Sequence, residues 1–153
     1  MSTLVLFDSN FGNTKRIADA IATELGARAL PLSEVGPGRP AGVDLLVAGS
    51  PIIAWKPTER MQAFLDSLGE GTLTGVKVAA FDTRVRLFIH GDAAGKISRA
   101  LEKAGAEIVA RPRGFIVEGR EGPLAAGEVE EATAWARSIA AAARKPDGTD
   151  FTD

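Results

Sequence analysis

A short polar loop stands between the first apolar segment of the chain and the first helical pattern. It reads Ser9-Asn10-Phe11-Gly12-Asn13-Thr14 and follows a strand expected at Thr3–Asp8. The first N–H groups of a helix lack intrahelical partners and carry partial positive charge. Hydroxyl and amide side chains around such a helix start make a pocket for a phosphate group. The alternative is an ordinary strand-to-helix turn in which Asn13 or Thr14 is the N-cap.

The composition excludes several other kinds of chemistry. The 153-residue chain has no cysteine and a single histidine, His90, which excludes disulfides, thiolate metal sites and iron–sulfur clusters. Its serines lack the G-x-S-x-G pattern of a nucleophile elbow. A net charge of -2 and a pI near 5.5 give no basic field for nucleic acid. No apolar stretch is long enough to span a bilayer and no signal peptide is visible, so we expect a soluble cytoplasmic protein.

Strand-like and helix-like segments alternate along the chain, which is typical of a parallel sheet covered on both faces. We predict strands at Thr3–Asp8, Arg28–Leu32, Asp44–Ala48, Val76–Phe81 and Glu107–Ala110, the last resuming at Gly114–Val117. We predict helices at Asn13–Leu25, from Thr58 to Gly69, from Asp92 to Gly105 and at Glu128–Ala143. We expect an α/β fold with a doubly wound, five-stranded parallel sheet of order 2-1-3-4-5. Residues 1–144 then form one domain, and residues 145–153 form a flexible C-terminal tail.

Ligands of such a sheet bind beyond the carboxyl ends of the strands, where the strand order switches between the first and third strands. Two further loops follow strands at this edge of the sheet, Ser50–Trp55 after the third strand and Asp82–His90 after the fourth. Trp55 and the β-branched residues before it would form one wall of a flat pocket, unless Trp55 folds back onto the domain as a rim residue. The second loop mixes cations with apolar side chains, which is also the pattern of a solvated loop with a small buried anchor. Because all three loops meet at one sheet edge, a binding site is favoured.

The polar loop resembles the phosphate loop of the flavodoxin family, usually written Ser/Thr-x-Thr-Gly-Asn-Thr. Val47–Pro51 resembles the start of that family's first flavin-flanking loop, and Ala106–Val109 with Trp135-Ala136 resembles its C-terminal part. The resemblance implies non-covalent FMN, with the phosphate on the first loop and the isoalloxazine ring between the other two. The cofactor-binding residues that it implies are Ser9, Asn10, Phe11, Gly12, Asn13, Thr14, Ser50, Pro51, Ile52, Ile53, Ala54, Trp55, Asp82, Thr83 and Arg84. It implies no metal ligand and no catalytic side chain.

Three features depart from the family pattern. Phe11 stands where threonine is usual, and the chain has no tyrosine to stack on the flavin, so Trp55 or Phe88 would take that place. The third loop carries Arg84 and Arg86 in place of a Gly-Asp-rich stretch. Beside the pyrimidine side of the ring, an arginine would stabilise the negative charge that collects on reduction and would raise the potential. The alternative is that these arginines point into solvent.

The resemblance implies an FMN-dependent electron-transfer protein that works with a flavin reductase or another redox partner protein, and it leaves the oligomeric state open. In that chemistry the flavin carries the electrons and the protein sets its potential and exposure. Two alternatives remain: a small FMN-dependent NAD(P)H:quinone-type oxidoreductase, and a flavodoxin-like module that has lost FMN and acts as a binding domain. A response-regulator receiver shares the sheet order but needs acidic residues where this chain has Asp8-Ser9 and Gly49-Ser50, so we reject it.

Overall fold

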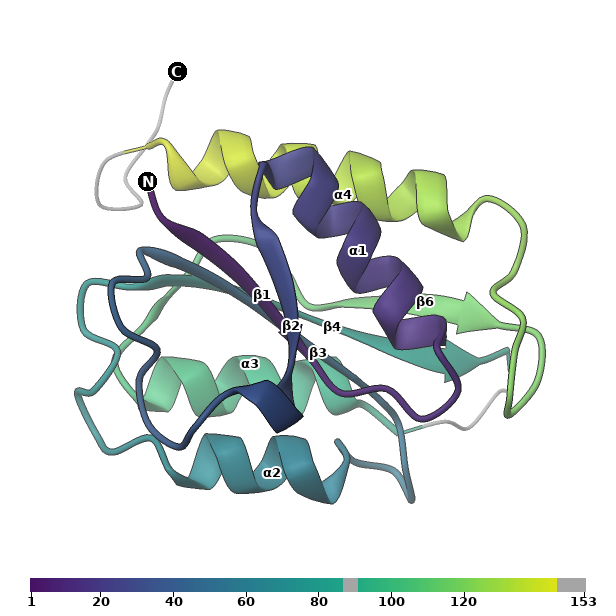
Figure 1. The fold of residues 1–153 in the computed structure, drawn as a ribbon, viewed down its shortest axis with the longest axis horizontal. Helices are drawn as coiled ribbons and strands as arrows, with labels where there is room; N and C mark the ends of the chain where they lie inside the picture. The colour runs from purple at the N-terminus through teal and green to yellow at the C-terminus, as the bar shows by residue number, and fades with distance from the viewer. Residues whose placement is uncertain (87–90, 146–153) are drawn as a thin grey trace.

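The computed structural model describes residues 1–86 and 91–145, which form a sheet between two layers of helices (Figure 1). The strands are β1 (Thr3–Phe7), β2 (Arg28–Pro31), β3 (Leu45–Pro51), β4 (Lys77–Val85), β5 (Glu107–Ile108) and β6 (Arg113–Val117). The helices are α1 (Asn13–Leu25), α2 (Glu59–Asp66), α3 (Ala93–Lys103) and α4 (Glu128–Ala143), with a 3-10 turn, η1 (Leu32–Glu34), after β2. The predicted first and last helices are therefore confirmed at both ends.

The predicted order of the parallel sheet is confirmed, since the strands run β2-β1-β3-β4-β5. The fifth strand is divided into two pieces, because β5 pairs with the start of β4 and β6 pairs with its end. Pro112 lies between the two pieces. A proline has no N–H to give to a strand ladder, which explains the interruption.

Helices cover both faces of the sheet, α1 and α4 on one and α2 and α3 on the other (Figure 1). Along β1, Val5 and Phe7 belong to the α1/α4 core, whereas Leu4 and Leu6 belong to the α2/α3 core. This alternation follows from the two-residue period of a strand. Trp135 on α4 lies in the α1/α4 core, where its ring packs edge-on against two buried phenylalanines.

Two central strands extend beyond their predicted ends. β3 continues to Pro51 and β4 to Val85, so the start of the predicted Asp82–His90 loop is strand instead. At this end β4 is paired on both sides, with β3 through Pro51↔Thr83 and with β6 through Val85↔Val117. These ladders hold an extended backbone where the mixed sequence indicated a loop.

α2 ends at Asp66 rather than near Gly69, while Thr58 is its N-cap. Residues 87–90, which include Phe88 and His90, lie outside the described residues, as do residues 146–153 of the predicted tail.

Candidate functional site

The carboxyl ends of the central strands open onto a cavity of about 510 Å³. Ligand pockets typically measure about 300–1,000 Å³. Hydroxyl and amide side chains from the segment after β1 line one part of it, and apolar side chains from the ends of β3, β4 and β6 line another. The lining residues are Ser9, Asn10, Phe11, Asn13, Thr14, Pro51, Ile52, Ile53, Ala54, Thr83, Arg84, Val85, Val117 and Arg120. The cavity lies at the sheet edge that the strand order predicted.

Most of the predicted cofactor residues meet at this cavity, but four do not line it: Gly12, Ser50, Trp55 and Asp82. Three lining residues were not predicted. Val85 and Val117 are paired in register on β4 and β6. Val85 lies in the part of β4 that was predicted as loop, whereas Val117 ends the predicted Gly114–Val117 strand but was not assigned to the site. Arg120 follows β6, and nothing in its local sequence connects it to the polar loop.

The turn into α1 presents backbone donors. Gly12 is the N-cap, with a φ of 89° in the left-handed region that glycine tolerates best. The alternative with Asn13 or Thr14 as N-cap is therefore wrong. Ser9 Oγ accepts the Gly12 N–H at 3.0 Å. No hydrogen bond within the described residues uses the backbone N–H groups of Asn10, Phe11, Asn13 or Thr14. A helix start of this kind suits an anion.

Two side chains of the same turn contact distant segments. Thr14 Oγ1 lies 2.9 Å from Thr83 Oγ1 on β4, and both side chains are buried. Asn13 Nδ2 donates to the carbonyl oxygen of Glu121, at 3.1 Å, in the segment after β6. A hydroxyl has one donor and two acceptor sites, so Thr14 retains capacity for a further hydrogen bond. The polar loop is thus positioned by tertiary contacts on two sides.

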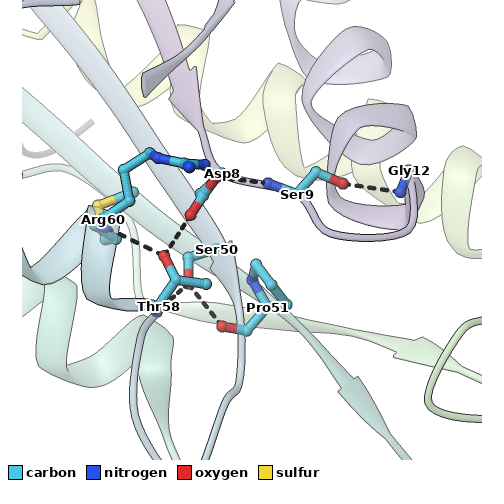
Figure 2. Close-up of polar contacts among 8 residues, drawn as sticks. Asp8, Ser9, Gly12, Ser50, Pro51, Thr58 and Arg60 are labelled. Carbon is cyan, nitrogen blue, oxygen red and sulfur yellow. Dashed lines mark hydrogen bonds and ion pairs between the residues drawn. The ribbon is translucent and has the colours of Figure 1, made fainter. Parts of the chain in front are cut away.

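Asp8 connects the polar loop to the segment that leads into α2 (Figure 2). Its carboxylate is 5% exposed and accepts hydrogen bonds from Thr58 Oγ1 at 2.6 Å and from Arg60 Nη1 at 2.8 Å. It also accepts the Ser9 N–H at 3.1 Å. A buried carboxylate is stable only when it is paired and hydrogen-bonded, and Asp8 is both. The start of the polar loop and the start of α2 therefore share one buried ionic group.

Ser50 and Thr58 shape the segment between β3 and α2 (Figure 2). Thr58 Oγ1 accepts the Met61 N–H at 3.1 Å and so caps α2. Ser50 Oγ accepts the Thr58 N–H at 3.2 Å and donates to the Pro51 carbonyl oxygen at 2.6 Å. Ser50 is fully buried, so it holds the cavity wall in place without lining it.

Ala54 and Trp55 form the tip of a tight turn beside the cavity. Ile53 and Lys56 exchange two backbone hydrogen bonds, at 2.7 and 3.1 Å, around this tip. The φ angles of Ala54 and Trp55 are 49° and 75°, a region that disfavours residues with a Cβ atom. Asn-Gly is the usual sequence of such a turn. Trp55 is 56% exposed and stands next to the apolar wall formed by Ile52, Ile53 and Ala54.

Asp82 and Arg84 form a buried ion pair at the end of β4. The fully buried Asp82 carboxylate accepts hydrogen bonds from Arg84 Nε at 2.7 Å and Nη2 at 2.6 Å, and from the Ala94 N–H at the start of α3. Asp92, the N-cap of α3, lies 3.6 Å from the same guanidinium. Hydrogen bonding to Asp82 raises the pKa of Arg84, against the opposing effect of burial. Arg84 reaches the cavity with its charge already compensated.

The other two arginines of this region differ from Arg84. Arg86 is 65% exposed, lies 4.0 Å from Glu118 and does not line the cavity, as in the solvent-facing alternative. Arg120 lines the cavity, and no carboxylate of residues 1–86 and 91–145 is within ion-pair distance of it. An arginine raises the flavin potential only if its charge is uncompensated and close to the ring. Arg84 is paired with Asp82, and Arg86 does not line the cavity, so neither residue meets this condition.

Two kinds of feature are missing from the described part of the chain. None of its helices is long and apolar enough to cross a membrane. Likewise, residues 1–86 and 91–145 contain no group of three or more histidine, aspartate or glutamate side chains placed to hold a metal ion.

Comparisons with known proteins agree with this architecture. Oxidised flavodoxin 1 from Bacillus cereus superposes with a TM-score of 0.77 at 19% identity, covering 92% of this chain and 98% of that one. A flavodoxin from the domain Archaea gives 0.74 at 18% identity, covering 94% and 99%. The rubredoxin oxygen:oxidoreductase of Desulfovibrio gigas gives 0.70 at 14% identity, covering 94% of this chain and 36% of that one. These structures share the fold.

No curated protein sequence matches the chain. The family model described as flavodoxin, however, matches residues 5–135. That range includes the end of β1, the polar loop after it, the wall after β3 and all the other strands of the sheet. The chain therefore belongs to the flavodoxin family.

Proposed function

We propose that the protein binds one FMN in the cavity and acts in electron transfer with a flavin reductase or another redox partner protein. The observation that carries this proposal is the division of the cavity between the polar loop, whose backbone N–H groups lack partners within the described residues, and apolar side chains. FMN has the same division, with a phosphate at one end and a flat ring at the other. Membership of the flavodoxin family supports the same ligand.

The polar part fits a phosphate. The backbone N–H groups of Asn10, Phe11, Asn13 and Thr14 have no partner within the described residues. The hydroxyl of Ser9, which accepts the Gly12 N–H, keeps its own proton to donate. Phe11 removes a hydroxyl that the family usually has, but its backbone N–H remains. The donors present therefore suffice for the several oxygen atoms of one phosphate group.

The apolar part fits the edge and face of a flat aromatic ring. Pro51, Ile52, Ile53 and Ala54 come from one wall, and Val85 and Val117 from the ends of β4 and β6. We propose that Trp55 covers the ring from the rim, since it is half-exposed and its turn is held in a strained conformation. Such strain is commonly kept where it serves binding.

FMN, when bound, supplies the electron-accepting chemistry. The residues of this chain bind the phosphate, exclude water from one side of the ring and fix the walls through Asp8, Ser50 and Thr58. The compensated Asp82–Arg84 pair adds no net charge at the cavity. No side chain has to take or release a proton for these tasks.

The test is titration of the apoprotein with FMN and with riboflavin, followed by flavin fluorescence. We expect one FMN per chain and clearly weaker binding of riboflavin, because riboflavin has no group for the polar loop. Equal affinity for the two flavins would refute the phosphate site. A protein that takes up neither flavin would support the alternative of a binding domain that has lost FMN.

The same loaded protein separates an electron carrier from an oxidoreductase. It is mixed with NADH or NADPH and a quinone, and nicotinamide oxidation is followed by absorbance. We expect no sustained turnover without a separate reductase. Turnover by the protein alone would replace the carrier function with NAD(P)H:quinone reduction.

A further inference from the structure

The segment between β6 and α4 lies against the polar loop, although it is far away in the sequence (Figure 1). Asn13 Nδ2 donates to the Glu121 carbonyl oxygen. Gly122 also approaches the Asn13 side chain so closely that a Cβ atom at this position would lie 2.7 Å from Asn13 Oδ1. Arg120 is thus carried on a segment that contacts the first turn of α1.

The charge of Arg120 is available to a ligand. Arg84, the other arginine that lines the cavity, is paired with Asp82. Lys15 in the first turn of α1 is paired with Asp19 at 2.8 Å. Arg120 lines the cavity, is exposed, and has no carboxylate partner within the described residues.

The polar loop itself has no cationic side chain from Ser9 to Thr14. A phosphate bound there carries up to two negative charges, which neutral N–H and hydroxyl donors solvate but do not neutralise. A guanidinium presents several N–H donors in a planar fork that matches phosphate oxygens. Arg120 therefore has the chemistry that the loop lacks, and it borders the same cavity.

We infer that Arg120 is a specificity-determining residue that binds the phosphate group of the flavin and makes the site selective for the phosphorylated form. This inference rests on the proposed function, because it takes FMN as the ligand. It assigns to the segment after β6 a role in phosphate binding, in addition to the loop after β1.

The experiment compares the wild type with Arg120→Gln, titrated with FMN and riboflavin at low and high salt. We expect the Kd for FMN to rise about tenfold in Arg120→Gln at low salt, the size of one exposed charge-assisted hydrogen bond. The Kd for riboflavin should not change. Raising the salt concentration should weaken FMN binding less in Arg120→Gln than in the wild type. Salt screens the attraction between Arg120 and the phosphate, and the variant no longer has that attraction.

Two variants control for other causes. Arg86→Gln removes the same charge at a position outside the cavity lining, so its affinity for FMN should match the wild type. Arg120→Lys keeps the positive charge but lacks the planar guanidinium, so its affinity for FMN should lie between those of Arg120→Gln and the wild type. Thermal unfolding of all variants verifies that the exposed substitutions leave the fold intact.

The outcomes distinguish this inference from the proposed function. If the wild type prefers FMN but Arg120→Gln binds it equally well, Arg120 has no role and the proposed function stands. If Arg120→Gln loses FMN and riboflavin alike, Arg120 acts at the ring and the inference is wrong. If the wild type binds both flavins equally, or neither, both the inference and the phosphate site fail.

Discussion

The two arginines that line the cavity differ in what faces their charge. Arg84 makes two hydrogen bonds to the fully buried Asp82, with Asp92 close behind, so its positive charge is balanced within the protein. Arg120 is exposed and has no carboxylate partner within the described residues. One arginine therefore stabilises the end of β4, while the other is free to meet a ligand.

The difference shows why residue type alone does not assign a role in a pocket. A charge interacts with the ligand only to the extent that no closer opposite charge compensates it. Arg84 was expected to raise the flavin potential, but at the cavity it belongs to a nearly neutral pair. Removing Arg84 and removing Arg120 should accordingly change different quantities, the first stability and the second affinity.

The largest expected effect is on folding. Arg84→Met leaves the Asp82 carboxylate buried with only the Ala94 N–H as partner. Breaking one side of a buried pair costs about 3–5 kcal/mol. We expect urea unfolding of the apoprotein to show a loss of that size, whereas Arg120→Met should change the free energy of unfolding by less than about 0.5 kcal/mol.

The double variant Asp82→Asn/Arg84→Met tests the cause of that loss. It removes both charges, so it should be more stable than Arg84→Met alone. The raised pKa of Arg84 means that its contribution is fully present below the ordinary pKa of arginine and is lost only as the pH rises through the raised value. The stability loss should therefore be the same at pH 6 and at pH 9, since both lie well below the ordinary pKa of arginine. A strong difference between the two would contradict the assignment.

The second effect is on flavin affinity. Thr14→Val removes a hydroxyl from the helix start that is proposed to bind the phosphate, which should weaken FMN by about 1.5–3 kcal/mol and leave riboflavin nearly unchanged. Thr14→Ser keeps the hydroxyl and serves as the control. If Thr14→Val weakens both flavins equally, the Thr14–Thr83 contact, and not the phosphate, is what the substitution disturbs.

The polar loop and Arg120 also differ in whether the sequence could place them at the cavity. Ser9 to Thr14 are contiguous, and the strand-to-helix turn that they form has a known ligand chemistry, so their meeting at the cavity was predictable. The place of Arg120 at the cavity was not, because its segment meets the polar loop only through the fold, by the contact of Asn13 with Glu121. No local pattern reports a contact across such a separation in the chain.

Asp82 was misplaced for a different reason. It was treated as a loop residue at the ligand, whereas it is buried in β4 and paired with Arg84. Residues two apart in a strand share a face, so the Asp82-Thr83-Arg84 spacing does predict an ion pair once the strand is known to extend that far. The missing information was the end of β4, which is set by pairing with β6 and not by local sequence.

A smaller effect is expected at the second buried carboxylate of the site. Asp8, like Asp82, is paired within the protein, and Thr58 both donates to it and caps α2. Thr58→Ala should lower the free energy of unfolding by about 1–2 kcal/mol, through the lost cap and the lost hydrogen bond. Thr58→Ser should retain most of the stability. Equal unfolding midpoints for Thr58→Ala and the wild type would show that Arg60 and the Ser9 N–H satisfy Asp8 without Thr58.

The smallest effects are expected at Trp55, where binding and stability should change in opposite directions. Its φ of 75° is unfavourable for a residue with a Cβ atom, and its side chain is 56% exposed. Trp55→Gly should therefore stabilise the apoprotein by up to about 1 kcal/mol, since glycine adopts this conformation without strain. If Trp55 stacks on the flavin, the same variant should weaken FMN by about 1 kcal/mol and brighten the emission of the bound flavin.

Trp55→Ala separates the two contributions at this turn. Alanine keeps the Cβ atom and hence the backbone strain, but it removes the ring. It should weaken FMN and brighten flavin emission as Trp55→Gly does, without the gain in apoprotein stability. If both variants keep wild-type affinity and emission, Trp55 is only a rim residue, and the ring is covered from elsewhere. In that case the strained backbone at Trp55 would have no role in flavin binding.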